Sequence, residues 1–131
     1  MDRVFGSCLC RAVQFYVDPP YDLAHCYCTR CRKKTGTARA TSLRVPPEQV
    51  TFSAGEEYIE RWYLPSARSF GTSVCRECGC PVPHLTRGRS RMIIPAGSID
   101  SELPVKPMGH WQWSSRANWV DLNESKLPCY D

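Results

Sequence analysis

Short stretches in which apolar and polar residues alternate recur along the chain, separated by prolines, glycines or charged turns. In residues 11–17, apolar side chains at every second position fall on one face, which is typical of a strand with one buried side. They are Val13, Phe15 and Val17. Residues 57–64 alternate in the same way, and we expect their apolar face to be buried. That face carries Tyr58, Trp62 and Leu64. Further extended segments are predicted at 38–45, 69–74, 82–85, 91–94 and 110–113.

One short helix is expected among these strands. Thr29 is of a residue type that caps helix N-termini, and a basic stretch follows it as far as Lys34. Gly36 then favours a helix end, because glycine adopts the left-handed backbone conformation without a steric penalty. Many short strands with a turn about every ten residues, and only one helical segment, predict an all-β fold with short helical turns.

The composition limits the kind of protein. The 131 residues fit a single domain spanning 1–131, and only 25 of them are Leu, Ile, Val or Phe. Eleven prolines argue against long helices, and no apolar run is long enough to cross a membrane. The polar start of the sequence carries no apolar secretory segment, so we expect a cytoplasmic location. Because the aliphatic core is thin, something else must help to hold the fold.

Nine cysteines offer that additional support, because most of them lie in short clusters. Residues 8–10 form a CxC, residues 26–31 a CxCxxC and residues 75–78 a CxxC. Disulfides are one alternative, but the count is odd, the spacing is very close and no export signal is visible. Zinc accounts for the spacing, since tetrahedral Zn–S bonds of about 2.3 Å bring the sulfurs about 3.8 Å apart. The clusters therefore predict at least one bound zinc.

The number of clustered thiols predicts two kinds of zinc site. Without Cys80, seven clustered thiols remain, and they divide into a set of four and a set of three. A closed four-sulfur site is structural, whereas a three-ligand site keeps one position open, as catalytic zinc does. The spacing does not assign each cysteine to a set, and Cys80 is an eighth candidate ligand that would close the open site.

The net charge gives little support for a nucleic-acid partner. The formal charge is +4, and two Zn²⁺ ions with seven thiolates would reduce it to +1. The positive charge is local instead, because no acidic residue lies between Asp22 and Glu48. The cations in that interval are Arg30, Arg32, Lys33, Lys34, Arg39 and Arg44. We expect a cationic wall beside the CxCxxC motif.

The three motifs resemble those of a known family. The segments GSCLC at 6–10, HCYCTRCRKKTG at 25–36 and CRECGCPV at 75–82 are similar to three motifs of the glutathione-dependent formaldehyde-activating (GFA) family, which is also found in centromere protein V. The tail, with His110-Trp111 and Asn118-Trp119, is similar to the end of that family. The resemblance covers nearly the whole chain, and the ordered series CxC, CxCxxC and CxxC is specific.

This resemblance implies a fold and a set of zinc ligands. The fold would be all-β, built of coiled sheets like those of the Mss4 exchange-factor family and stabilised by zinc. Two zinc ions would bind to each chain, one structural and one catalytic. The structural ligands would be Cys8, Cys10, Cys75 and Cys78. The catalytic ligands would be Cys26, Cys28 and Cys31.

The resemblance also implies an activity, that of a carbon–sulfur lyase which joins glutathione and formaldehyde into S-hydroxymethylglutathione. The expected partners are a small thiol such as glutathione and a small aldehyde, with no membrane partner and with a homodimer left open. Arg32 and Lys33 could bind the carboxylates of the thiol, or could form a solvated charged face. His110 either lines the substrate pocket or is an interior histidine.

The sequence departs from the family pattern at three positions. Arg11 stands where the family usually has Gly, Tyr27 where His is common, and Cys80 where Ser is usual. The last two bear on the exact substrate more than on the fold. The alternative function is a non-catalytic, zinc-scaffolded binding module for protein or nucleic acid, which closure of the open site by Cys80 would favour.

Overall fold

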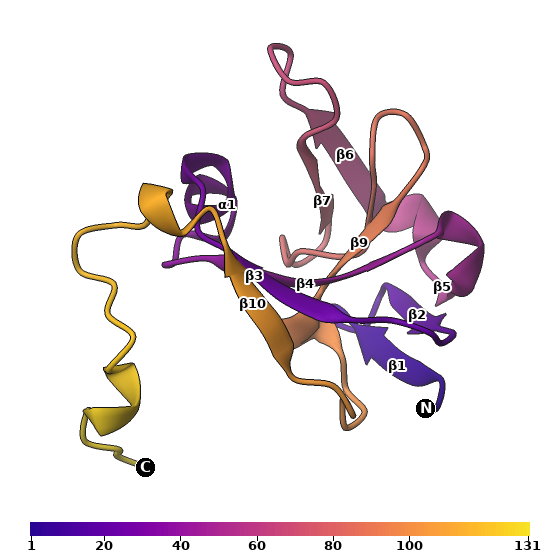
Figure 1. Ribbon diagram of the computed structural model, residues 1–131. Helices are drawn as coiled ribbons and strands as arrows, with labels where there is room; N and C mark the ends of the chain where they lie inside the picture. The colour runs from indigo at the N-terminus through magenta and orange to yellow at the C-terminus, as the bar shows by residue number, and fades with distance from the viewer.

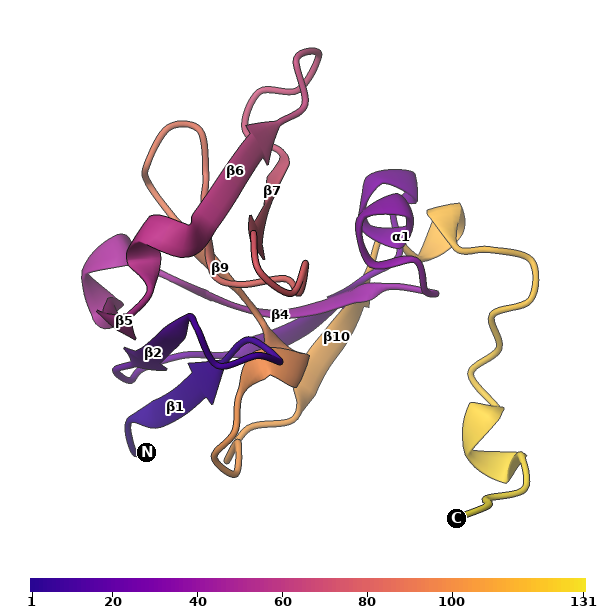
Figure 2. The same cartoon turned by 180° about the vertical axis from the view of Figure 1, so that it is seen from behind.

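A computed structural model describes all residues, 1–131, and arranges them as three small β-sheets and one α-helix (Figures 1 and 2). An antiparallel sheet has the order β1-β2-β5, with bounds Val4–Ser7, Gln14–Val17 and Val50–Ala54. A five-stranded sheet has the order β10-β3-β4-β9-β8. Its strands are β3 (Leu23–Cys26), β4 (Ala40–Val45), β8 (His84–Leu85), β9 (Met92–Pro95) and β10 (Pro107–Trp111).

The third sheet is a hairpin of β6 (Ile59–Tyr63) and β7 (Gly71–Cys75). The single α-helix, α1, spans Thr29–Thr35 and connects β3 to β4. Short 3-10 turns fill the remaining corners, at Pro47–Gln49, Glu56–Tyr58, Ala96–Ser98, Trp113–Ser115 and Glu124–Lys126. No helix of this protein combines the length and the apolar character that a membrane crossing requires. The expected all-β class with short helical turns is thus confirmed.

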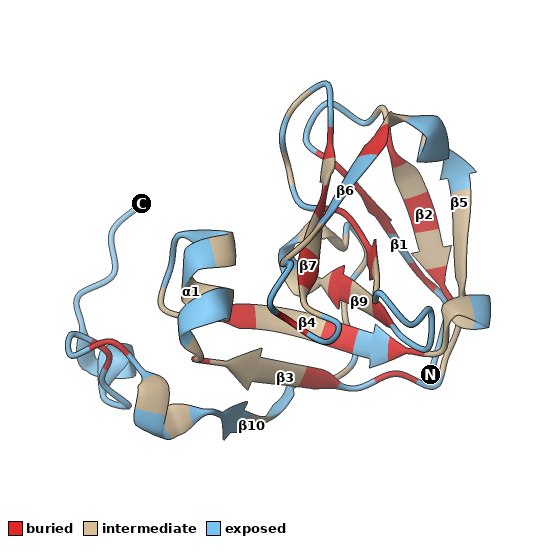
Figure 3. Ribbon diagram, turned by 90° about the horizontal axis from the view of Figure 1, so that it is seen from above, coloured by how far each residue is buried: buried red, intermediate tan, exposed pale blue.

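The largest apolar core lies between the antiparallel sheet and the five-stranded sheet. The alternation expected in residues 11–17 is present, because Val13, Phe15 and Val17 are each no more than 1% exposed. Phe15 and Val17 belong to this core, whose other members are Val4, Tyr21, Leu23, Leu43, Val45, Met92 and Ile94. Figure 3 shows the same pattern as buried stretches along β2, β4 and β9.

A second, smaller core joins the beginning of the chain to the β6–β7 hairpin. Val13, Ile59 and Val82 form it together with the cysteines Cys8 and Cys75. Three aliphatic side chains bury little apolar surface, so this part of the fold depends on what its sulfur atoms do. This core places the segment that carries the CxC motif beside the later CxxC motif.

The structure corrects the predicted burial of residues 57–64. The 3-10 turn Glu56–Tyr58 takes up Tyr58, so β6 begins at Ile59, and Ile59 is the residue that packs inward. Trp62, expected in the core, points to the opposite face and is 53% exposed. Ile59 and Trp62 lie on opposite faces of β6, and the Ile59 face is the one that packs against a core.

The C-terminal segment extends away from the body after one apolar anchor (Figures 1 and 2). Ala117 and Val120 pack against Tyr27, which is 1% exposed. All residues from 121 to 131 are exposed. The anchor matters for the site, because Tyr27 lies inside the CxCxxC motif.

Candidate functional site

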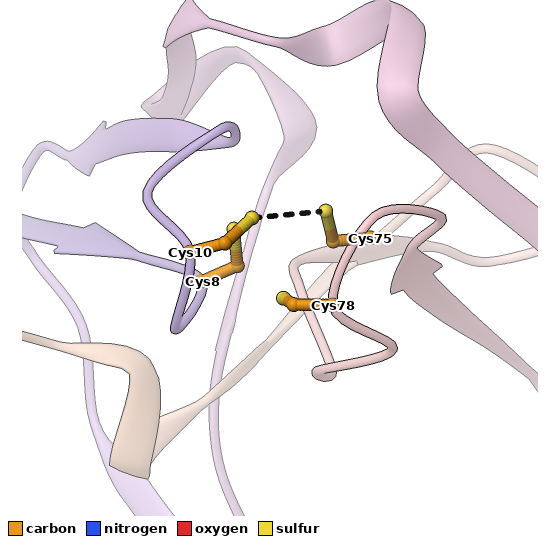
Figure 4. A group of neighbouring side chains, drawn as sticks. All are labelled: Cys8, Cys10, Cys75 and Cys78. Atoms are coloured by element: carbon orange, nitrogen blue, oxygen red, sulfur yellow. Dashed lines mark hydrogen bonds between the residues drawn. The ribbon is translucent and has the colours of Figure 1, made fainter.

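Four thiols from two distant parts of the sequence come together between the β1–β2 loop and the end of β7 (Figure 4). The sulfur atoms of Cys8, Cys10, Cys75 and Cys78 all lie within 4.8 Å of one another. The Sγ atoms of Cys8 and Cys10 are 3.7 Å apart, and those of Cys10 and Cys75 are 3.9 Å apart. These separations match the value of about 3.8 Å that a tetrahedral zinc–thiolate site requires.

Two tight turns bring these sulfurs together. In the first, the Arg11 backbone N–H donates to the Cys8 carbonyl at 3.0 Å, and Arg11 adopts φ 64°. A left-handed residue at this point explains why glycine suits it and shows that arginine accepts the same turn. In the second, Gly79 has φ 75° and its N–H donates to the Cys75 carbonyl at 2.7 Å. Each turn folds a short CxC or CxxC segment so that both of its sulfurs face the same point.

The surroundings of this group favour a thiolate at Cys78, and the thiolate is the form that binds metal. The backbone amides of Cys10 and Cys80 lower the pKa of the Cys78 thiol to about 6. The Val13 N–H also donates to Cys8 Sγ at 3.3 Å. Four sulfurs at this spacing, partly served by backbone donors, fit a zinc ion without rearrangement of the chain.

Three further thiols gather where β3 leads into α1. Cys26 ends β3, Cys28 is the N-cap of α1, and Cys31 lies in its first turn. Their sulfur atoms lie within 4.8 Å of one another. The Cys31 N–H donates to Cys28 Sγ at 3.3 Å, so Cys28 caps the helix rather than the expected Thr29. The expected helix end at Gly36 is confirmed, with φ 70°.

The electrostatics of this group favour ionisation of one thiol. Burial opposes charge on Cys28, but the amide of Cys31 and the neighbouring thiols outweigh it and lower the pKa of Cys28. Burial and the same neighbours raise the pKa of Cys31. The Cys28 sulfur therefore ionises more readily than that of Cys31, and a bound cation would displace the thiol protons of its ligands. With three donors, this group fits a zinc ion that keeps one position for another ligand.

A cavity of ≈ 570 Å³ opens beside the three-thiol group. Its size lies in the range of small-molecule sites. Cys26 and Cys31 line it, and the wall carries more positive than negative charge. Its charged residues are Lys34, Arg44, Arg91 and Asp22. Burial lowers the pKa of Lys34, and the positive charge of nearby Arg44 lowers it further. The two cations therefore lie close enough to repel each other. The cavity is thus suited to a small anionic ligand.

A hydrogen-bonded aromatic cluster supports the three-thiol group from behind. The Tyr27 hydroxyl lies 2.8 Å from His110 Nδ1, and the His110 ring stacks on His25 with centroids 5.5 Å apart. His25 Nδ1 lies 2.7 Å from Thr41 Oγ1, and His25 lines the cavity. Burial, with Arg39 and His110, lowers the pKa of His25 and keeps its ring neutral. The Tyr27 hydroxyl thus orients the His110 ring.

Several candidate residues lie elsewhere than the sequence predicted. Arg32, Lys33 and His110 are not among the residues that line the cavity, and their role in substrate binding stays a prediction. Cys80 belongs to neither thiol group and lines a separate hollow of ≈ 490 Å³ beside Cys8.

The cavity residues that the sequence did not single out come from distant segments. They include His84 on β8 and Arg91 just before β9, whereas Arg44 on β4 belongs to the expected cationic wall. A basic segment around Arg44 was visible in the sequence, but no local pattern connects it to His84 or Arg91.

Comparison with known proteins agrees with this geometry. The sequence model of the family described as "Glutathione-dependent formaldehyde-activating enzyme" matches residues 3–115, which include both thiol groups. A crystal structure of a Rhodobacter sphaeroides protein from a structural genomics programme has the same fold, with a TM-score of 0.62 at 20% identity. The similarity covers 76% of this chain and 91% of that one. No curated protein matches the sequence. On the match to the family model, the chain belongs to the glutathione-dependent formaldehyde-activating enzyme family.

Proposed function

We propose that this protein is a carbon–sulfur lyase of the GFA type, which joins a glutathione-like thiol to a small aldehyde such as formaldehyde. The observation that carries the proposal is the position of Cys26 and Cys31 in the wall of a cationic cavity of ≈ 570 Å³. The family model supports the substrate class, because its description names glutathione and formaldehyde. The three thiols are proposed as the site that holds the catalytic zinc, and the four thiols as the structural site.

The reaction needs little chemistry beyond placing two reactants together. A bond forms between the thiol sulfur and the aldehyde carbon, the C=O π bond breaks, and the proton of the thiol ends on the aldehyde oxygen. When bound at the three-thiol group, zinc supplies a Lewis acid that can hold a thiolate or polarise a carbonyl. Ionising a thiol of pKa about 8.5 completely at pH 7 gains at most about 30-fold in thiolate. Orientation can supply more, up to about 7–11 kcal/mol.

The residues of the chain supply that orientation. Lys34, Arg44 and Arg91 offer positive charge to the carboxylates of the thiol, which fixes the position of its sulfur. The rings of Phe70 and Trp111 line the same cavity and reduce the space open to water. A small aldehyde needs no charged partner of its own.

Turnover of a thiol and formaldehyde tests the proposal. Proton NMR of glutathione with formaldehyde measures exchange between the free thiol and the hydroxymethyl adduct, with and without protein. The proposal predicts faster exchange with the zinc-loaded protein and no acceleration with Cys28→Ser. The exposed Cys129, which lies outside both thiol groups, provides the matched control Cys129→Ser, expected to act like the wild type. Equal exchange rates with and without the wild-type protein would contradict the lyase function and leave the binding-module alternative.

A further inference from the structure

One buried histidine in the cavity wall has an unpaired ring nitrogen. His84 lies in β8, lines the cavity and is 2% exposed. Its Nδ1 atom lies 2.7 Å from Ser73 Oγ. Its Nε2 atom is buried and has no hydrogen-bond partner in the protein. Because buried polar atoms are nearly always paired, an unpaired nitrogen in a cavity wall points to a ligand atom as its missing partner.

The hydrogen bond to Ser73 identifies which ring nitrogen carries the proton. Ser73 is 1% exposed, and its hydroxyl has only His84 Nδ1 as a partner. If the hydroxyl donates to Nδ1, the ring proton lies on Nε2 and a single group remains unpaired. The other tautomer would leave both the Ser73 hydroxyl hydrogen and the Nε2 lone pair without partners. The favoured arrangement makes Nε2–H a donor, and so the missing partner is an acceptor.

The ring is held firmly before any ligand arrives. The Tyr63 ring packs against it with centroids 5.2 Å apart. On another side, Gly71 approaches so closely that a Cβ there would lie 3.1 Å from His84 Cε1. The Nε2–H donor therefore has one orientation, which favours a ligand of matching shape. Since Nε2 is almost wholly covered, a ligand atom reaches it only when a neighbouring side chain moves. A slim ligand group needs the smallest movement and is therefore the best fit.

The charges around His84 favour a negatively charged acceptor. Burial lowers its pKa to about 4, and the cations Lys34 and Arg61 act in the same direction, so the ring is neutral at pH 7. Lys34 also lines the cavity, in which Asp22 is the one acidic residue. A neutral N–H donor beside an ammonium group suits a carboxylate oxygen better than a cation or an apolar group.

We propose that His84 is a specificity-determining residue whose Nε2–H donates a hydrogen bond to a carboxylate oxygen of the thiol substrate, in a subsite that it shares with Lys34. The assignment rests on the proposed function, because it takes the ligand to be a thiol that carries a carboxylate. Ser73 is a positioning residue, since it fixes the tautomer of His84 without touching the ligand.

Binding of an unreactive ligand tests the subsite without turnover. S-methylglutathione retains both carboxylates but has no thiol hydrogen, and its diethyl ester has no carboxylate. Calorimetry with the zinc-loaded protein is expected to show that His84→Phe weakens S-methylglutathione binding about 10- to 100-fold. The weaker binding of the diester should be the same in both proteins. His84→Gln, which restores an N–H donor, should recover part of the affinity, and Ser73→Ala should lose less than His84→Phe.

Three results would overturn the proposal. Unchanged S-methylglutathione affinity in His84→Phe would show that Nε2 bonds only to water. An equal loss for the acid and the diester would show that the ring has a structural role alone. A nitrogen NMR spectrum with the ring proton on Nδ1 would refute the donor assignment.

The same experiments separate this proposal from the lyase function. If S-methylglutathione binding depends on His84 but formaldehyde exchange is not accelerated, the carboxylate subsite stands and the lyase function fails. If exchange is accelerated but binding does not depend on His84, the lyase function stands and the subsite fails.

Discussion

Replacement of Cys75 by serine should unfold the protein, because it removes one sulfur from the group that joins the beginning of the chain to the β6–β7 hairpin. Cys75 is fully buried, at 0% exposure, and Cys8 beside it is 2% exposed. The core around them contains only three aliphatic residues, Val13, Ile59 and Val82. There is little other apolar contact to hold the hairpin in place.

The magnitude follows from comparing metal binding with the stability of a domain. A structural zinc site contributes about 10–16 kcal/mol of apparent binding free energy. The whole free energy of unfolding of a domain is about 5–15 kcal/mol. If Cys75→Ser abolishes zinc binding at this group, the free energy lost is therefore as large as the whole stability of a domain.

Circular dichroism and urea unfolding measure this effect in Cys75→Ser, with Cys129→Ser as the matched control. Cys129 is exposed and belongs to neither thiol group, so its variant should unfold like the wild type. Cys75→Ser should lose its cooperative transition, or unfold in far less urea. A cooperative transition within about 1 kcal/mol of the wild type would refute the structural role of the four-thiol group.

Three further predictions concern the cavity and its neighbours. Cys28→Ser should keep the fold, because serine also caps helices. It should lose exchange activity and one zinc ion per chain. Unfolding equal to that of Cys75→Ser would contradict the division into a structural and a catalytic group. Arg44→Met should raise KM for glutathione about 10-fold with kcat nearly unchanged and leave the diester unaffected, as steady-state kinetics can check. Acid should destabilise the fold through His84, whose folded pKa of about 4 lies below the usual value of 6.5, so that the unfolded chain binds the proton first. The contribution of His84 to the free energy of unfolding is complete above pH 6.5 and falls toward pH 4. At pH 5 it is lower by about 2 kcal/mol. Urea unfolding of wild type and His84→Phe at pH 7 and pH 5 measures this difference. Parallel losses in the two proteins would refute the assignment to His84.

The sequence predicts those parts of the fold in which neighbouring residues share one environment. The alternation of Val13, Phe15 and Val17 marks β2, and Gly36 marks the end of α1. The strands β1, β3 and β5 were not predicted, because each has only four or five residues and none alternates clearly between buried and exposed side chains. The buried face of β6 was assigned wrongly, since the sequence does not show that a 3-10 turn absorbs Tyr58.

The tryptophans show a related limit. Trp62, Trp111 and Trp119 are 53%, 46% and 64% exposed, although tryptophan side chains are on average highly buried in folded proteins. A thin core has little room for such large side chains. At Trp111, the exposed ring instead lines the cavity, where a ligand can cover it.

Part of the candidate site could be predicted from the sequence, and part could not. Ligand spacing is local, so the CxC, CxCxxC and CxxC motifs predicted thiol groups, and the structure brings the same seven sulfurs together as four and three. The cavity is not local: Arg44, His84 and Arg91 meet because β4, β9 and β8 are neighbours in one sheet, and α1 adds Lys34. The sequence pointed to Arg32 and Lys33 instead, because it does not show which side of α1 faces the cavity.

Metal analysis of the protein as purified tests the central claim most directly, when the zinc content is measured together with the number of reactive thiols. The two thiol groups predict two zinc ions per chain, with seven sulfurs protected until a chelator is added and with Cys80 and Cys129 free to react. A folded protein that contains no zinc, or whose clustered cysteines are joined as disulfides, would contradict the account.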